Sequence, residues 1–226
     1  MERTLTALLY RRDARAALAA RDFGRLGLAG DAAAIAAFAA LDLHELEASA
    51  ALVRQMLLAR RHRGTGGLVD WYPRTLAAWR VGHANDASLD ELAASFLESP
   101  HAEAWREGAA GEPGQCLEEA FYRFACARGL GDAASRQDEW LTAQLRALAL
   151  CPEPAFTIPA ELTRAPGGGW FAVAGAADAP ILYAAVRGRF IRGGLSPALA
   201  ALLRGEAPAA GAPEEVRIRL VELGLW

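Results

Sequence analysis

Four histidines and three cysteines are the side chains of this 226-residue chain best suited to bind a metal or to act as a nucleophile. No two histidines lie four residues apart, no HExxH motif occurs, and the cysteines form no CxxC pair. Cys116 and Cys126 fall on one predicted helix, where ten residues separate them by about 15 Å along the axis. The sequence therefore predicts no metal site, no disulfide framework and no activated thiol. The seven residues are His44, His62, His83, His101, Cys116, Cys126 and Cys151.

Two further patterns could carry chemistry but are better explained by structure. The glycine-rich run PGGGW (166–170) lacks the GxxxxGK[ST] residues of a phosphate-binding loop and precedes a strand, so it predicts a hairpin turn. Glu118 and Glu119 are adjacent and point in different directions on a helix, which makes them a poor acid–base pair. A catalytic site would have to be assembled by folding. The candidates for it are Asp70, Tyr72, His83 and Glu118.

The segment DWYPRTLAAW (70–79) places an acid, two aromatics and a proline at the start of a predicted helix. We expect Asp70 to cap this helix and the two aromatics to pack against its first turn. Amphipathic aromatics beside an arginine are also typical of residues that anchor a protein interface. Both interpretations stay open. The predicted partner-interface residues are Asp70, Trp71, Tyr72 and Arg74.

The charge and hydropathy of the chain argue against two classes of partner. Its net charge is −3 and its pI about 5.9, which predicts no general attraction to nucleic acid or to an anionic membrane. No stretch reaches the roughly 18 apolar residues of a membrane span, and the N-terminal apolar run is too short for a signal peptide. We therefore expect a soluble, cytoplasmic protein that binds neither nucleic acid nor a membrane.

The first two thirds of the chain are predicted to be helical almost throughout. The chain is 53% hydrophobic and rich in alanine, a composition that favours helices. Asp31 and Asp42 are suited to cap the helices that follow them. Two prolines in CPEPA (151–155) then predict the end of the helical part. The expected organisation is a helical domain, 1–151, and a smaller domain, 152–226.

The second domain is richer in glycine, proline and β-branched residues. Short turns separate segments that have the pattern of strands, which predicts an antiparallel meander followed by two short helices. The strand segments are WFAVAG (170–175) and PILYAAVRGRFIRGG (180–194), and the helical ones are SPALAALLRG (196–205) and PEEVRIRLVELGLW (213–226). We therefore predict an α+β fold, in which a mostly helical N-terminal domain precedes a small winged-helix-like domain.

The second domain is better suited to bind a peptide than DNA. From Pro152 onward seven arginines are matched by seven acidic residues, whereas a winged helix that binds DNA needs an excess of positive charge. An open strand edge can instead accept a peptide through backbone hydrogen bonds. The alternative is that the same side chains fill the core of the domain. The candidate peptide-binding residues are Phe171, Val173, Ile181 and Tyr183.

Several motifs, taken together, resemble the partner proteins of multinuclear non-haem iron-dependent oxidases in methanobactin-type and thiaglutamate-type biosynthesis. The second domain resembles the leader-recognition elements of peptide-modification systems. The resemblance implies that this chain binds the leader of a ribosomally made precursor peptide and presents the core peptide to the oxidase, which modifies a cysteine. It implies no cofactor on this chain, because the iron lies on the partner. The motifs are DWYPRTLAAW, SFLESP, CLEEAFYRF, FTIPAEL, WFAVAG, ILYAAVRGRFIRGGLSPALAALL and LVELGLW.

The preferred hypothesis is a non-catalytic accessory subunit that combines a scaffold with a peptide-recognition module. One alternative is a transcriptional regulator whose second domain binds DNA while the helical part senses a ligand. The other is a helical enzyme with an unrecognised active site.

Overall fold

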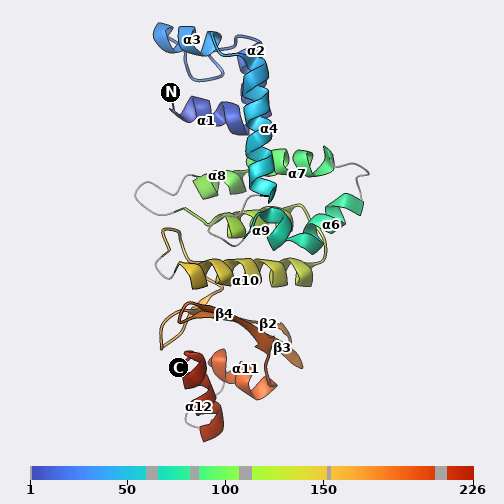
Figure 1. Cartoon of the computed structure of the whole chain (residues 1–226), viewed down its shortest axis with the longest axis vertical. Helices are drawn as coiled ribbons and strands as arrows, with labels where there is room; N and C mark the ends of the chain where they lie inside the picture. Colours follow the sequence, from blue (N-terminus) through green and yellow to red (C-terminus); the bar gives the residue numbers. More distant parts are fainter. Residues whose placement is uncertain (1, 60–65, 82–86, 107–113, 152–153, 207–212) are drawn as a thin grey trace.

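The computed structural model describes residues 2–59, 66–81, 87–106, 114–151, 154–206 and 213–226. Within these ranges it has an α+β fold with twelve helices and one four-stranded sheet. The molecule is elongated, with α3 at one end and α12 at the other (Figure 1). No described helix is long and apolar enough to cross a membrane.

The first four helices form one end of the molecule around a small core that contains Leu8, Leu18 and Phe38. Asp31 accepts a hydrogen bond from the amide of Ala34, and Asp42 accepts bonds from two amides in the first turn of α4, so both predicted caps are confirmed. The long helix α4 then reaches the middle of the molecule (Figure 1). The four are α1 (Glu2–Tyr10), α2 (Arg12–Ala19), α3 (Ala32–Ala39) and α4 (Leu43–Ala59).

Six more helices build the middle of the molecule around its largest core. Phe96, Phe121 and Phe124 meet edge to face or tilted, with ring centroids 5.4–5.9 Å apart. The helices are α5 (Leu68–Trp71), α6 (Pro73–Val81), α7 (Ala87–Leu97), α8 (Pro100–Arg106), α9 (Leu117–Ala127) and α10 (Ala133–Leu150).

The four strands form an antiparallel meander in the order β1-β2-β3-β4. They are β1 (Thr163–Arg164), β2 (Trp170–Ala176), β3 (Ala179–Val186) and β4 (Arg189–Gly194). The stretch 180–194 is thus a hairpin, turning at Arg187 and Gly188, which both have positive φ angles, 50° and 71°. A two-residue hairpin turn with positive φ angles favours Asn or Gly in its first position. Arginine stands there in this chain, so the sequence alone does not indicate the turn.

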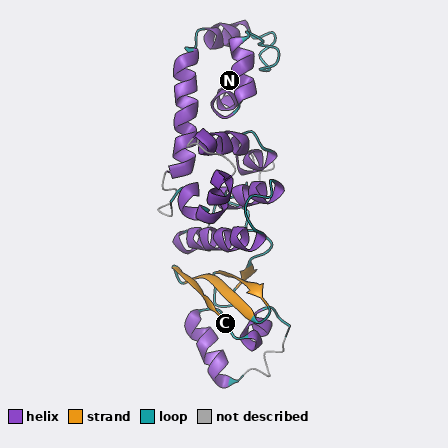
Figure 2. Ribbon diagram, turned by 90° about the vertical axis from the view of Figure 1, so that its right-hand side faces the viewer, coloured by secondary structure: helices purple, strands orange, loops and turns teal. Residues whose placement is uncertain are grey.

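The sheet is the central layer between α10 and the two last helices, α11 (Pro197–Leu203) and α12 (Glu214–Leu223) (Figures 1 and 2). Side chains alternate between its two faces. Ala172, Tyr183 and Ala185 join the large core on the α10 side, and Phe171 and Leu182 join a second core under α11 and α12. The large core therefore continues from the helical part into the sheet, across the expected domain boundary at 151/152.

Candidate functional site

The outer edge of β4 is the longest unpaired strand edge in the described part of the chain. Leu195 donates its N–H to the carbonyl of Pro180 at 2.8 Å, which makes Ile181 and Gly194 a pair of the non-hydrogen-bonded kind. Because the pattern alternates, every second residue of β4 points its N–H and C=O away from β3. These residues are Phe190, Arg192 and Gly194, and their backbone groups have no partner among the described residues.

Part of this edge carries positive charge. From Ala179 to Gly205 the chain has four arginines and no acidic residue, although Arg204 lies at the end of α11, Arg187 bonds to Val221 and Arg192 pairs with Asp138. Arg189 is exposed and has no ion-pair partner in the described ranges, and Arg146 of α10 lies 5.3 Å from the centre of the Phe190 ring. The sequence contains this stretch without acidic residues, but a count over the whole second domain, with seven arginines and seven acidic residues, does not reveal it.

Arg192 connects the β4 edge to the helical part of the molecule. Its Nε and Nη2 donate to one carboxylate oxygen of Asp138 on α10, at 3.0 and 2.8 Å. The hydroxyl of Tyr183 and the guanidinium of Arg74 donate to the same carboxylate. Burial alone would raise the pKa of Asp138, but these three donors outweigh it and lower the pKa.

Burial and the bond to Asp138 raise the pKa of Tyr183 to about 12, so this tyrosine is a neutral hydrogen-bond donor at neutral pH. It is only 2% exposed. The strand that carries it, β3, is paired on both sides. A peptide strand therefore cannot be added beside Tyr183 or Ile181.

The other two candidate peptide-binding residues lie on β2. Phe171 is buried under α11 and α12 and is paired with Thr163 of β1. Val173 is half-buried beyond the end of β1, and its backbone groups face the free part of the β2 edge. The four candidates thus lie on two strands and on both faces of the sheet. Their role in peptide binding stays a prediction.

The predicted partner-interface residues are divided between the core and the surface. Trp71 and Tyr72 are buried, and the Tyr72 ring lies 4.9 Å from that of Phe121. Asp70 is exposed, and it caps the short helix α5 by accepting from Gly67 N–H at 3.0 Å, not the following helix as expected. Arg74 is also exposed. Only Asp70 and Arg74 of this set could contact a partner directly.

Helix α6, which begins at Pro73, is capped by a side chain of another helix. The buried carboxylate of Glu139 accepts from the backbone N–H of Arg74 at 2.6 Å and from the N–H and hydroxyl of Thr75 at 3.1 and 2.6 Å. A carboxylate on the first amides of a helix stabilises them and its dipole. Helix α10 therefore holds α6 through Glu139 and the sheet through Asp138. No local pattern in the sequence indicated either contact.

The residues proposed for an enzyme site are partly brought together. Tyr72 donates to the carbonyl of Glu118, whose side chain is 3% exposed, but His83 lies outside the described residues. Burial, followed by the charge of Glu118, raises the pKa of Tyr72 well above its usual value, so Tyr72 is not suited to act as a base.

The cysteines do not combine with other side chains into a metal site within the described ranges. Cys116, at the N-cap of α9, is buried, and its thiol donates to Oε1 of Gln144 at 2.7 Å. Cys126, near the end of the same helix, is exposed. The described residues contain no group of three or more histidine, cysteine or acidic side chains that could hold a metal ion. No protein-family model matches this chain, and no curated protein or solved structure was found to be similar to it.

Proposed function

We propose that this chain is a non-catalytic accessory subunit, and that the β4 edge binds an extended, acidic segment of a precursor peptide. The observation that carries the proposal is an unpaired edge, formed by Phe190, Arg192 and Gly194, beside which Arg189 and Arg146 have no ion-pair partner among the described residues. A peptide strand would gain backbone hydrogen bonds there, and its acidic side chains would meet the arginines.

The shape of the edge supports the addition of a strand. A Cβ added to Gly193 or Gly194 would meet no atom within 4 Å, so a second backbone can approach this end of β4 closely. The free part of the β2 edge is the other candidate position. It offers only the outward groups of Val173 and Gly175, and the nearest charge in the chain is the acidic Asp178. Both length and charge therefore favour β4.

The remaining parts of the proposal follow from this position. The sheet with α11 and α12 would serve as a winged-helix-like recognition module, and the helical part would dock on an iron-dependent oxidase that modifies a cysteine of the core peptide. The motifs that resemble the partner proteins of such oxidases support this assignment. The exposed Asp70 and Arg74 are candidate contacts with that enzyme, which would carry the iron.

A binding experiment with two matched charge reversals tests the peptide site. A synthetic extended peptide in which glutamate alternates with valine is labelled and titrated against the full-length protein and against Arg189→Glu and Arg204→Glu. Both arginines are exposed and have no ion-pair partner among the described residues, but Arg204 lies at the end of α11, away from β4. We expect Arg189→Glu to weaken binding about tenfold and Arg204→Glu to change it little. Equal affinities for all three proteins would contradict the β4 assignment.

Co-expression with an iron-dependent oxidase of the kind that the proposal requires tests the accessory role separately. We expect the oxidase and this chain to purify together, and the oxidase to modify the peptide only when this chain is present. Full oxidase activity without it would overturn the accessory role but not the peptide site.

A further inference from the structure

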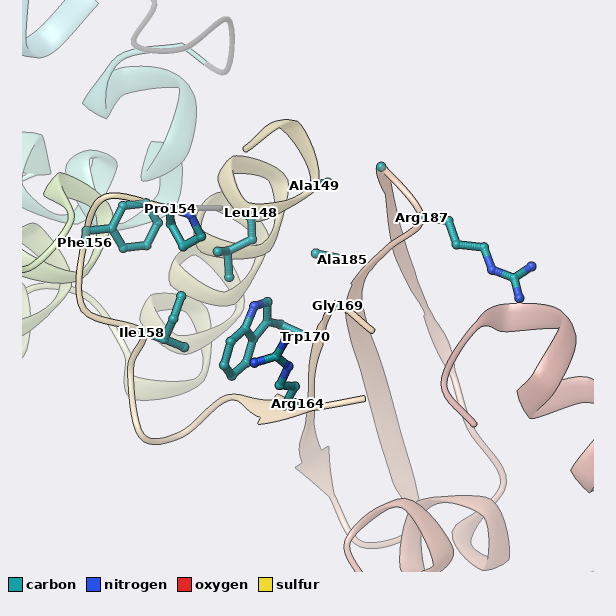
Figure 3. A pocket seen from close by; sticks show the side chains of 11 residues that line it. Leu148, Ala149, Pro154, Phe156, Ile158, Arg164, Gly169, Trp170, Ala185 and Arg187 are labelled. Carbon is teal, nitrogen blue, oxygen red and sulfur yellow. The ribbon is translucent and has the colours of Figure 1, made fainter. Parts of the chain in front are cut away.

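A cavity lies at the opposite end of the sheet from Gly194, where the end of α10 meets the start of β2. It has a volume of about 640 Å³, within the range of pockets that bind small molecules. Three separate segments form its walls: the end of α10, the extended connection 154–158, and the strand ends with the β3–β4 turn. Figure 3 shows Trp170 between Leu148 and Ile158, with Arg164 against its ring.

Among the described residues, this cavity has mostly apolar walls and one arginine directed at it. The large apolar side chains that line it are Leu148, Phe156, Ile158 and Trp170. Among the described lining residues the charged ones are Arg164 and Arg187. Arg187 points away toward α12, where its Nη2 donates to the carbonyl of Val221 at 3.4 Å (Figure 3). Arg164 is therefore the charge that serves this cavity.

The guanidinium of Arg164 is oriented by an aromatic ring, and no acid of the described ranges neutralises it. It lies 5.7 Å from the centre of the Trp170 ring, a cation–π contact that restricts where it can point. Arg164 has no acidic partner among the described residues. A guanidinium held in this way still has the two parallel N–H donors that match a carboxylate.

The backbone fixes the position of Trp170 as well. Gly169 has a φ of +91°, and a Cβ there would come within 2.3 Å of the carbonyl of Ala185. Strand β2 therefore starts in close contact with β3. The Trp170 ring is held at the cavity before a ligand binds, so binding does not have to restrict its motion further.

We propose that this cavity binds an apolar side chain that adjoins a carboxylate, as in a peptide that ends in a hydrophobic residue or carries one beside an acidic residue. The apolar group enters between Trp170, Ile158 and Leu148, and the carboxylate pairs with Arg164. The charge complementarity selects an anionic ligand, and the apolar walls reject one that is charged throughout. This site is separate from the β4 edge and does not depend on the function proposed for that edge.

Three small probes distinguish the sources of the carboxylate. N-acetyl-phenylalanine carries a terminal carboxylate, N-acetyl-aspartyl-phenylalanine amide carries a side-chain carboxylate, and N-acetyl-phenylalanine amide carries neither. Each is titrated into the full-length protein while the indole N–H signal of Trp170 is followed by NMR. That signal is assigned with Trp170→Phe, since the chain has six tryptophans.

We expect at least one carboxylate probe to shift the Trp170 signal and to bind about tenfold more tightly than the neutral amide. Arg164→Gln should abolish this preference and Arg164→Lys should restore part of it. Ile158→Ser should weaken all probes by a similar factor. Arg204→Gln, at the end of α11 and outside the cavity, is the control and should leave probe binding unchanged.

Equal binding of acid and amide by the wild-type protein would overturn the proposal, as would the absence of any shift at Trp170. A preference that survives Arg164→Gln would also overturn it. Ile158→Ser is further compared with the wild type by sedimentation, and conversion of a dimer to a monomer would show that a second copy of the chain occupies the cavity instead. Circular dichroism and thermal melting confirm that each variant is folded.

Discussion

Asp138 on α10 accepts two hydrogen bonds from the guanidinium of Arg192 on β4, at 3.0 and 2.8 Å. The same carboxylate accepts from Tyr183 and Arg74, so one acidic side chain joins the sheet, α10 and α6. This arrangement fixes Arg192 beside the strand edge that we propose to bind a peptide.

Replacing this carboxylate should destabilise the protein. Asp138→Asn removes the charge that holds three donors, and we expect the free energy of unfolding to fall by about 1–2 kcal/mol, since the two arginines are about half exposed to solvent. Urea unfolding measures the change. Asp178→Asn, in the exposed β2–β3 turn, is the matched control and should be nearly neutral. If the free energy of unfolding of Asp138→Asn equals that of the wild type, the bonds to Asp138 contribute nothing to stability.

The lowered pKa of Asp138 predicts a specific loss of stability in acid. A carboxyl group whose pKa is lower in the folded than in the unfolded protein contributes stability above its ordinary pKa, 3.8. This contribution is lost as the pH falls from that value through the lower folded pKa. Urea unfolding from pH 6 down to pH 3 should therefore show a smaller acid loss for Asp138→Asn than for the wild type. Parallel curves for the two proteins would contradict the assignment.

The cap that Glu139 provides for α6 can be tested by an isosteric change. Glu139→Gln keeps the shape of the side chain but places an NH₂ group against one of the donors from Arg74 or Thr75, and we expect a loss of about 2–3 kcal/mol. Urea unfolding measures this loss, and hydrogen exchange should show faster exchange of the Arg74 and Thr75 amides. Glu222→Gln, on the exposed surface of α12, is the control. Unchanged exchange at both amides would show that Glu139 is not their cap.

Two neighbouring glycines separate backbone strain from steric contact in the turn before β2. Gly168 and Gly169 have nearly the same φ, +90° and +91°, but only at Gly169 would a Cβ meet another atom, the carbonyl of Ala185 at 2.3 Å. Both alanine variants should be strained, and Gly169→Ala should be destabilised by about 2 kcal/mol more than Gly168→Ala. Thermal unfolding compares them. Equal losses would mean that the approach of β2 to β3 is less close than described.

The features that follow from local sequence were predictable. Asp31 and Asp42 cap helices through amides two or three residues away, a relationship that a short pattern contains. The α+β composition and the order of helices, meander and final helices follow in the same way. The hairpin at Arg187 was missed because a positive φ at a non-glycine residue depends on the pairing of the strands around it.

The features that depend on distant residues could not be read from the sequence. Arg192 and Asp138 are 54 positions apart, and Arg74 and Asp138 are 64 apart, so no spacing rule connects them. The aromatics Trp71 and Tyr72 have the composition of interface anchors, but helices that come much later in the chain bury them. Which strand edge is open depends in the same way on the pairing order of the sheet.

Amide hydrogen exchange in β4 tests the central claim most directly. Exchange is measured by NMR on the full-length protein with and without the synthetic acidic peptide used in the binding titrations. An added strand would bond the outward amides, so Phe190, Arg192 and Gly194 should exchange more slowly when the peptide is bound, while Ile191 and Gly193, already paired with β3, should change little. Binding of the peptide with no protection at those three amides, or with protection at Val173 and Gly175 instead, would contradict the claim.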